Sequence, residues 1–232
     1  MMNKKILASS GFTLVEIMIS LVLSSFVIAG VYGVYSIQQR SYKTQGQVAD
    51  LQQQLRSALD FITRDIRMVG YNPGGVCSVN PTTYGILNMG VDNFSFEYCG
   101  LEDNTWKLHT VTYSLEGSRL MRNLQVQDSP GQQQAVAEGI DAIEFRYLQG
   151  NSPPGHPELP PPEADLAKDT RIIQLSILIR SLYPDPYYKD TITYLPASGK
   201  AWTRTSGSGN PPNDNYQRRL LVTSIELRNV GL

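Results

Sequence analysis

Residues 11–39 read GFTLVEIMISLVLSSFVIAGVYGVYSIQQ, and this stretch decides the fold. Its last 23 positions, from Ile17 to Gln39, carry no charged side chain. As an α-helix rising about 1.5 Å per residue they would reach roughly 35 Å, more than the ~30 Å hydrocarbon core of a bilayer. Lys4 and Lys5 precede the stretch, and the positive-inside tendency places that end in the cytoplasm. The rest of the chain is therefore expected on the other side of the membrane.

Three interpretations of this apolar segment compete. A cleaved secretory signal peptide would have a shorter apolar run, of about 7–15 residues, followed by a small-residue cleavage site. A plain single-pass anchor fits the length but leaves Glu16 unexplained, because an ionisable residue costs about 2.5–3.5 kcal/mol at the bilayer centre and less near its edge. A helix that is processed and then assembled with other helices gives Glu16 a role, and the local sequence favours it.

The hexapeptide from Gly11 to Glu16 resembles the type IV prepilin signature. In that signature a short basic leader ends in Gly, and the mature chain begins with Phe and has Glu as its fifth residue; counted from Phe12, Glu16 is the fifth. The resemblance implies that a prepilin peptidase cleaves after Gly11 on the cytoplasmic side and that Phe12 is N-methylated. Residues 1–11 would be the leader, and residues 12–39 would remain as the transmembrane, assembly half of a helix.

Cleavage would create a new α-amine at Phe12, and such an amine is largely cationic near neutral pH. Glu16 lies four residues along the helix, so its carboxylate can form a salt bridge with this amine in its own chain or in a neighbouring subunit. Either pairing compensates a charge that is otherwise costly among apolar helices. The simpler alternative is that Glu16 is an interfacial carboxylate in headgroup water.

Beyond the apolar run, apolar residues recur at steps of three or four, as one face of an amphipathic helix requires. They are Val48, Leu51, Leu55, Leu59, Ile62, Ile66 and Val69. The spacing predicts that one nearly continuous helix extends from about Phe12 to about Val69, with residues 40–71 as its amphipathic half. Pro73, after Asn72 and before two glycines, is expected to end it.

Two short stretches carry a second resemblance. Arg64-Asp65-Ile66-Arg67 followed by Gly70-Tyr71 is similar to the PilW family of minor type IV pilins, and the J-type pseudopilins of type II secretion are similar here. Near the end, Arg218-Arg219-Leu220 and Leu227-Arg228-Asn229 resemble the terminal strand of that family. The simpler interpretation of the first stretch is an ordinary amphipathic helix with charged residues on its outer face.

Residues 72–232 have the alternating pattern of half-buried strands. The alternating residues are Phe94, Phe96 and Tyr98; Val111, Tyr113 and Leu115; Ile143, Phe145 and Tyr147; Ile173, Leu175, Ile177 and Ile179; and Leu221, Ile225 and Leu227. Glu116-Gly117-Ser118 is typical of a hairpin turn. The sequence thus predicts an α+β fold in which the helix stripe packs on a mainly antiparallel, β-rich periplasmic head, and this matches the pilin fold that the resemblance implies.

Cys77 and Cys99 are the only cysteines, and translocation would place both in an oxidising compartment. We expect a disulfide between them, two buried free thiols being the alternative. Two further stretches, 149–169 and 196–215, are rich in loop-forming residues; either is a mobile insertion or a recognition surface, with Trp202 as the candidate anchor. Loop acids such as Asp185, Asp190 and Asp214 could bind calcium, but they lack EF-hand spacing.

Composition offers little raw material for catalysis or nucleic-acid binding. The 20 Lys and Arg nearly balance the 21 Asp and Glu, whereas a nucleic-acid binder working through a basic surface carries a cationic excess. The two histidines, His109 in a strand pattern and His156 in a proline-rich loop, belong to no zinc, nucleophile or phosphate-loop motif. We therefore expect no enzyme, no cofactor and no bound metal.

The resemblance implies a minor type IV pilin of the PilW kind that takes part in pilus assembly or initiation, in a minor-pilin complex at the tip. Its partners would be the prepilin peptidase, other major and minor pilins and inner-membrane lipid, with a tip adhesin as a further candidate. It would sit in the inner membrane with its head in the periplasm, then in the pilus or its tip at the cell surface. The alternatives are a J-type type II secretion pseudopilin, a membrane-anchored periplasmic enzyme, and an adhesive or DNA-capturing pilus subunit.

Replacing Gly11 with Leu should leave the precursor uncut, because a bulky side chain would stand at the cleavage position. Mass spectrometry of protein from native membranes should find the wild-type chain beginning with N-methyl-Phe12 and the Gly11→Leu chain still carrying residues 1–11. A wild-type N-terminus beyond residue 25 would instead identify an ordinary signal peptide.

Overall fold

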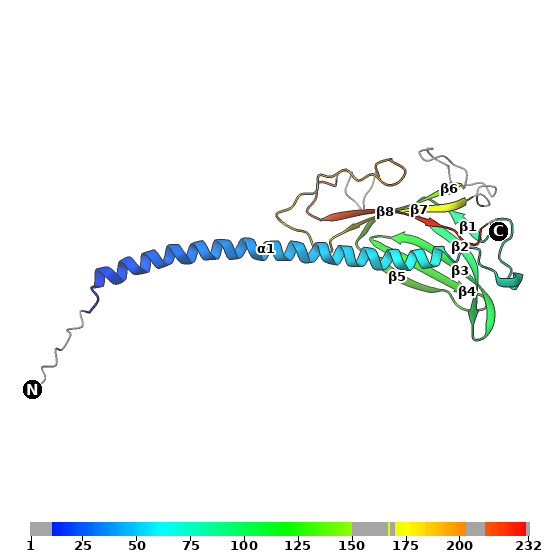
Figure 1. Ribbon diagram of the computed structural model, residues 1–232, viewed down its shortest axis with the longest axis horizontal. Helices are drawn as coiled ribbons and strands as arrows, with labels where there is room; N and C mark the ends of the chain where they lie inside the picture. Colours follow the sequence, from blue (N-terminus) through cyan, green and yellow to red (C-terminus); the bar gives the residue numbers. More distant parts are fainter. Residues whose placement is uncertain (1–10, 150–166, 168–169, 203–211, 231–232) are drawn as a thin grey trace, which may run out of the picture. The chain divides into compact units, whose positions relative to one another are not determined.

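The computed structural model describes residues 11–149, 167, 170–202 and 212–230. Its elements are α1 (Leu14–Ile66), a 3₁₀ turn (Pro73–Gly75), and the strands β1 (Ile86–Met89), β2 (Phe94–Glu102), β3 (Thr105–Glu116), β4 (Arg119–Val126), β5 (Gln132–Glu138), β6 (Ile140–Gln149), β7 (Thr170–Arg180) and β8 (Arg218–Glu226) (Figure 1). The chain divides into two compact units, Met1–Gly46 and Gln47–Leu232, and the division falls inside α1. One long N-terminal apolar helix followed by antiparallel strands confirms the predicted α+β fold.

Both ends of α1 have a local cause. At the start, the Thr13 hydroxyl accepts a hydrogen bond from the Glu16 backbone N–H at 3.3 Å, and the T-x-x-E spacing is that of a capping box. At the other end, Gly70 has a φ of +71°. This left-handed conformation stops the helix and suits glycine, since a side chain would strain it. The helix itself ends at Ile66, and the turn that follows it closes at Gly70, slightly before the expected stop at Asn72 and Pro73.

The strands of the second unit form two antiparallel sheets. Five strands lie in the order β1-β2-β3-β4-β5, and three lie in the order β6-β7-β8. The chain passes from one sheet to the other through Gly139 alone, between the end of β5 and the start of β6. Gly139 has a φ of +71°, and a Cβ there would lie 2.6 Å from the Arg180 carbonyl oxygen. A division into two sheets is a feature that the alternating pattern did not predict.

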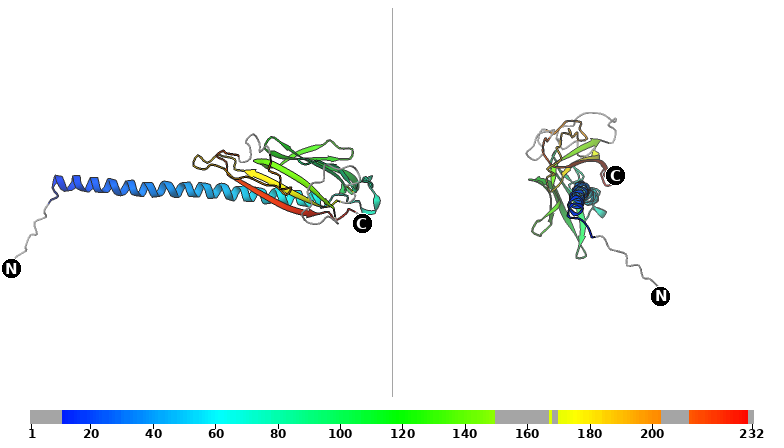
Figure 2. Two further views of the ribbon diagram at one scale, coloured as in Figure 1. Left: turned by 90° about the horizontal axis from the view of Figure 1, so that it is seen from above. Right: turned by 90° about the vertical axis from the view of Figure 1, so that its left-hand side faces the viewer.

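One hydrophobic core joins α1 to both sheets. Its α1 residues are Leu51, Leu55, Ala58, Ile62 and Ile66. The predicted stripe included all of these except Ala58, and its Leu59 is only partly buried against the core. Opposite them lie the inward side chains of the central strands, among them Phe94, Phe96, Val111, Tyr113, Phe145, Ile173, Leu175, Ile177 and Ile179. Within this unit the cyan part of α1 runs alongside the strands of both sheets, as Figure 1 and Figure 2 show.

The segment that follows the helix is tied to β2. Cys77 and Cys99 form the expected disulfide, with Cα atoms 5.7 Å apart. The Asn72 side chain both accepts from the Cys77 N–H at 3.0 Å and donates to the Cys77 carbonyl at 2.8 Å. The Cys99 N–H donates to the Tyr71 carbonyl at 2.7 Å. Covalent and hydrogen bonds thus close the loop between helix and sheet.

Replacing Gly70 with Ala should destabilise the second unit by about 1–3 kcal/mol, the usual cost of a non-glycine residue in a sparsely populated backbone region. The added Cβ would also lie 2.5 Å from the Tyr84 carbonyl oxygen. Gly46→Ala is the matched control, because a Cβ at this helix glycine meets nothing within 4 Å. Thermal unfolding followed by near-ultraviolet circular dichroism compares the two, and a Gly70→Ala transition as high as that of Gly46→Ala would contradict the assignment.

Candidate functional site

The residues that match the prepilin signature lie at the exposed N-terminal end of α1. Phe12 is 81% exposed and precedes the helix, whereas Glu16 lies in its first turn. Their predicted roles in cleavage, methylation and assembly concern the processed chain and stay predictions. The Thr13 cap is a contribution that the sequence interpretation missed, although the T-x-x-E spacing could have indicated it.

The apolar half of α1 is uncovered in the first unit. Its large side chains are more than half exposed; they include Leu14, Ile17, Ile19, Leu21, Leu23, Phe26, Ile28, Val31, Tyr32, Val34 and Ile37. The helix is long and apolar enough to cross a membrane by length and composition. Burying one such side chain contributes about 1.5–3 kcal/mol. This surface therefore favours lipid or the apolar helices of other subunits over water.

An ion pair fixes the second half of α1 on the five-stranded sheet. Asp65 accepts hydrogen bonds from the Tyr113 hydroxyl, at 2.7 Å, and from the Arg122 guanidinium. The side chains of Asp65 and Arg122 are only 13% and 10% exposed. Burial and the nearby Asp65 carboxylate raise the pKa of Tyr113 above its usual range, so this phenol stays a hydrogen-bond donor. The expectation that the charged residues here face outward is wrong for Asp65, which faces the sheet.

The two stretches that resemble the PilW family meet at the C-terminal end of α1. The Asn229 side-chain amide donates to the carbonyl oxygens of Arg67 and Val69, at 3.0 and 3.2 Å. These two carbonyls belong to the turn just beyond α1, and the Asn229 amide gives both of them a hydrogen-bond donor. The end of the chain thereby holds the end of the helix.

A second buried cluster lies on the three-stranded sheet. The Arg218 guanidinium binds Asp141, Asp190 and Asp214, and the side chains of Arg218, Asp141 and Asp190 are fully buried. Burial raises the pKa of Asp141, and hydrogen bonds from Arg218 oppose that shift. Asp190 and Asp214 belong to the long connection between β7 and β8, so the cluster fastens this connection to the sheet. Two of the three aspartates considered for calcium thus serve as partners of an arginine.

The connection between β7 and β8 includes the expected anchor, Trp202. Trp202 is half-buried and packs with Tyr194 against Ala142 and Leu178 of the sheet. Part of Trp202 thus packs on the sheet, and its suggested role as a recognition anchor stays a prediction. Most of the stretch 149–169, which contains His156, and the central part of 196–215 lie outside the described residues, as do leader residues 1–10.

The described residues form no metal-binding cluster, and His109 is packed within a sheet. Within 11–149, 167, 170–202 and 212–230, no cluster of three or more His, Cys, Asp or Glu side chains could hold a metal ion. His109 lies on β3 with its ring centroid 4.9 Å from that of Tyr98. Burial lowers the pKa of His109, which keeps this half-buried imidazole neutral. Its position between strands is that of a packed side chain.

Together, the bare apolar helix and the β-rich unit fastened to its far half define a class of protein. The N-terminal helix is long and apolar enough to cross a membrane, and the second unit folds around the rest of that helix.

Comparisons with known proteins point to the same class. Residues 7–32 match the family model of the prokaryotic N-terminal methylation motif. The structure is similar to that of a type IV-like pilin from Thermus thermophilus, with a TM-score of 0.52 and 13% sequence identity over 79% of this chain and 100% of that chain. A comparison with curated proteins gives no significant match. The chain thus has a type IV pilin-like fold and an N-terminal methylation motif, which support a type IV pilin and point to a structural protein rather than an enzyme.

Replacing Asp65 with Ala should destabilise the second unit by about 3 kcal/mol, because the buried Arg122 would lose its ion pair. Removing the partner as well, in Asp65→Ala/Arg122→Met, should recover part of that loss. Asp60→Ala, at an exposed position on the same helix, is the control and should change little. Urea unfolding measures all three, and equal midpoints for Asp65→Ala and Asp60→Ala would contradict the role given to Asp65.

Proposed function

We propose that this chain is a minor pilin of a type IV pilus, of the PilW kind, acting in pilus assembly or initiation as part of a minor-pilin tip complex. It is made as an inner-membrane prepilin, cleaved after Gly11 and N-methylated on Phe12. The head lies in the periplasm, and the processed chain then joins the filament or its tip. The observation that carries this proposal is the methylation motif at the start of a helix whose apolar half is uncovered.

The physical argument begins with the two halves of α1. The stripe from Leu51 to Ile66 already has its partner, since the core buries it within the same chain. The apolar half has none among the described residues, and lipid and apolar helices are the surroundings that suit it. Lateral movement from lipid into a bundle of like helices preserves the apolar surroundings. The apolar half of α1 is therefore compatible both with the membrane before assembly and with the helix bundle of a filament after it.

A salt bridge from Glu16 would favour one axial register between adjacent helices of that bundle. Among apolar helices, a carboxylate is stabilised by a cation, and processing would supply one at Phe12. An amine and a carboxylate on adjacent helices attract each other when the helices are offset by about one turn, because Phe12 and Glu16 are four positions apart. The Thr13 cap provides a competing role, in which Glu16 belongs to a capping box that starts the helix.

Replacing Glu16 with Val should leave membrane level, cleavage and head folding unchanged but reduce recruitment into the pilus or its initiation complex. Glu16→Gln separates the two roles, because Gln can serve in a capping box yet carries no charge. If the salt bridge matters, both variants should lose recruitment, as measured by crosslinking to other pilins and by counting surface filaments.

Three other outcomes would each correct the proposal. Normal recruitment of Glu16→Val would show that the carboxylate is dispensable in this subunit. Normal recruitment of Glu16→Gln alone would assign Glu16 to the helix start. Deletion of the whole gene with intact pili but failed protein secretion would favour the J-type pseudopilin instead.

A further inference from the structure

β5 is an edge strand with little protection. Among the described strands its only neighbour is β4, so no described strand pairs with the backbone groups of its other edge. Proteins usually guard such edges with lysines, prolines or very short strands. The seven residues of β5, QQQAVAE, contain neither lysine nor proline, and Gln132 to Ala135 are exposed.

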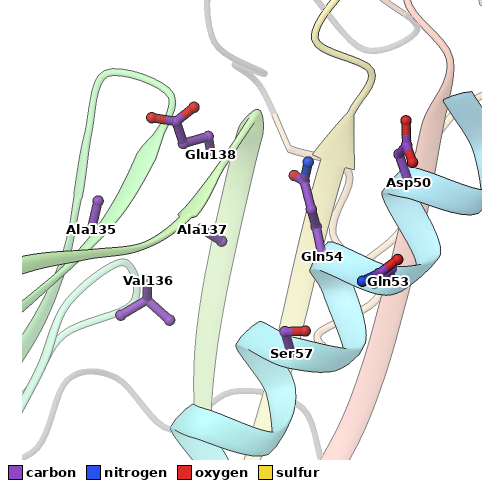
Figure 3. A pocket seen from close by; sticks show the side chains of 8 residues that line it. All are labelled: Asp50, Gln53, Gln54, Ser57, Ala135, Val136, Ala137 and Glu138. Carbon is purple, nitrogen blue, oxygen red and sulfur yellow. The ribbon is translucent and has the colours of Figure 1, made fainter.

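An open groove of about 570 Å³ separates this strand from α1, within the second unit. One wall is the helix face with Asp50, Gln53, Gln54 and Ser57, and the other is the end of β5, residues 135–138, as Figure 3 shows. Met121 of β4 pairs with Ala135 and Leu120 pairs with Ala137, so Val136 is an extra residue that forms a β-bulge. A bulge bends its strand, and here it lies where the groove opens.

The groove holds a polar group that lacks a partner. The side-chain oxygen Oε1 of Gln54 is buried and accepts no hydrogen bond from any described residue. Buried polar atoms are nearly always paired. Because this oxygen is shielded from solvent, a donor in the groove would reach it only after the Gln54 side chain rotates toward the groove. An N–H group of a bound segment is such a donor.

The negative charge of the groove favours a bound segment with a cationic side chain. Its lining residues include two carboxylates, Asp50 and Glu138, and no lysine or arginine. Arg119 approaches Glu138 at 3.3 Å, but this pair lies on the exposed rim, where an ion pair contributes little. Asp50 keeps the helix wall acidic.

We propose that the free edge of β5 and the facing helix wall bind an extended, lysine- or arginine-containing segment of another pilin subunit. The segment adds as a strand beside β5, its backbone pairs with the free edge, and its cationic side chain lies near Asp50 and Glu138. Strand addition of this kind draws its affinity from main-chain hydrogen bonds and its specificity from side-chain pockets. That the partner is a pilin rests on the proposed function.

The test is site-specific photocrosslinking of the full-length chain in native membranes. In one variant a photoreactive phenylalanine analogue replaces Gln53 on the groove wall. In a second variant it replaces Val27 in the apolar half of α1, as a separate probe of assembly. Mass spectrometry then identifies the partner peptide. The Gln53 probe should capture a lysine- or arginine-containing segment of a different chain that itself carries a processed N-terminal methylation motif.

Three variants test whether the Gln53 adduct depends on the β5 edge and on the acidic helix wall. Ala135→Lys places a charge on the free edge and should abolish the adduct. Asp50→Lys reverses the charge of the exposed helix wall, and should also abolish it without altering the sheet. Ser224→Lys is the matched control on β8, an edge strand of the other sheet, and should leave the adduct at its wild-type yield.

The two probes separate the groove from the proposed function. Suppose that the Val27 probe crosslinks to other pilins. The groove proposal is then overturned, and the pilin role stands, if the Gln53 probe gives no adduct. The same holds if the Gln53 probe captures a second copy of this chain, an unrelated protein, or residues 150–166 or 203–211 of its own chain. An adduct that survives both Ala135→Lys and Asp50→Lys also overturns it. Loss of pilin adducts at both positions overturns the groove and the pilin assignment together.

Discussion

Burial of the Leu51–Ile66 stripe of α1 is the interaction on which the second unit depends, because both sheets contribute to the core around it. A three-stranded and a five-stranded sheet each have one apolar face that must be covered. The helix supplies a common surface for both, and the passage between the sheets at Gly139 is only one residue long. Without the helix stripe, each sheet would expose aromatic and branched side chains to water, at about 25 cal/mol for each Å².

The two halves of the same helix differ in their surroundings. The first half is apolar on all sides and exposed, whereas the second is amphipathic and buries its apolar stripe within the chain. The first half must find lipid or other helices, and either choice keeps its backbone hydrogen bonds internal, which a helix alone achieves within a single segment. This type IV pilin-like fold therefore combines a folded β-rich unit with an exposed apolar helical segment.

Buried charges fix the orientation of elements that apolar contacts alone would hold loosely. Asp65 accepts from Tyr113 and Arg122, and Asn229 donates to the turn just beyond the helix. On the other sheet, Arg218 gathers aspartates from a strand and from a long connection. Such pairs add little net stability compared with apolar residues, but losing one partner is costly, so they specify a single arrangement. Arg67 and Asn229, far apart in sequence, are brought together by this hydrogen bonding.

Several features could be predicted from the sequence because they depend on local geometry. A 3.6-residue period identifies the buried face of a helix, and a two-residue period identifies strands such as β2, β3, β6 and β7. The pairing of Cys77 with Cys99 could be expected because the sequence has only two cysteines, and the structure confirms it. β5 escaped prediction because QQQAVAE has no apolar alternation, as expected for a strand with only one neighbour and much of its surface exposed.

The sequence by itself determined the long helix, its apolar and amphipathic halves, the methylation motif and the β-rich character of the rest. Only the tertiary structure decided that the strands form two sheets, that Asp65 faces inward, that Asn229 reaches the end of α1 and that a groove opens beside β5. Periodicity is set by the backbone of a few consecutive residues, so it is visible in the sequence. The partner of a charge or of a strand edge is chosen by residues dozens of positions away, which no local pattern encodes.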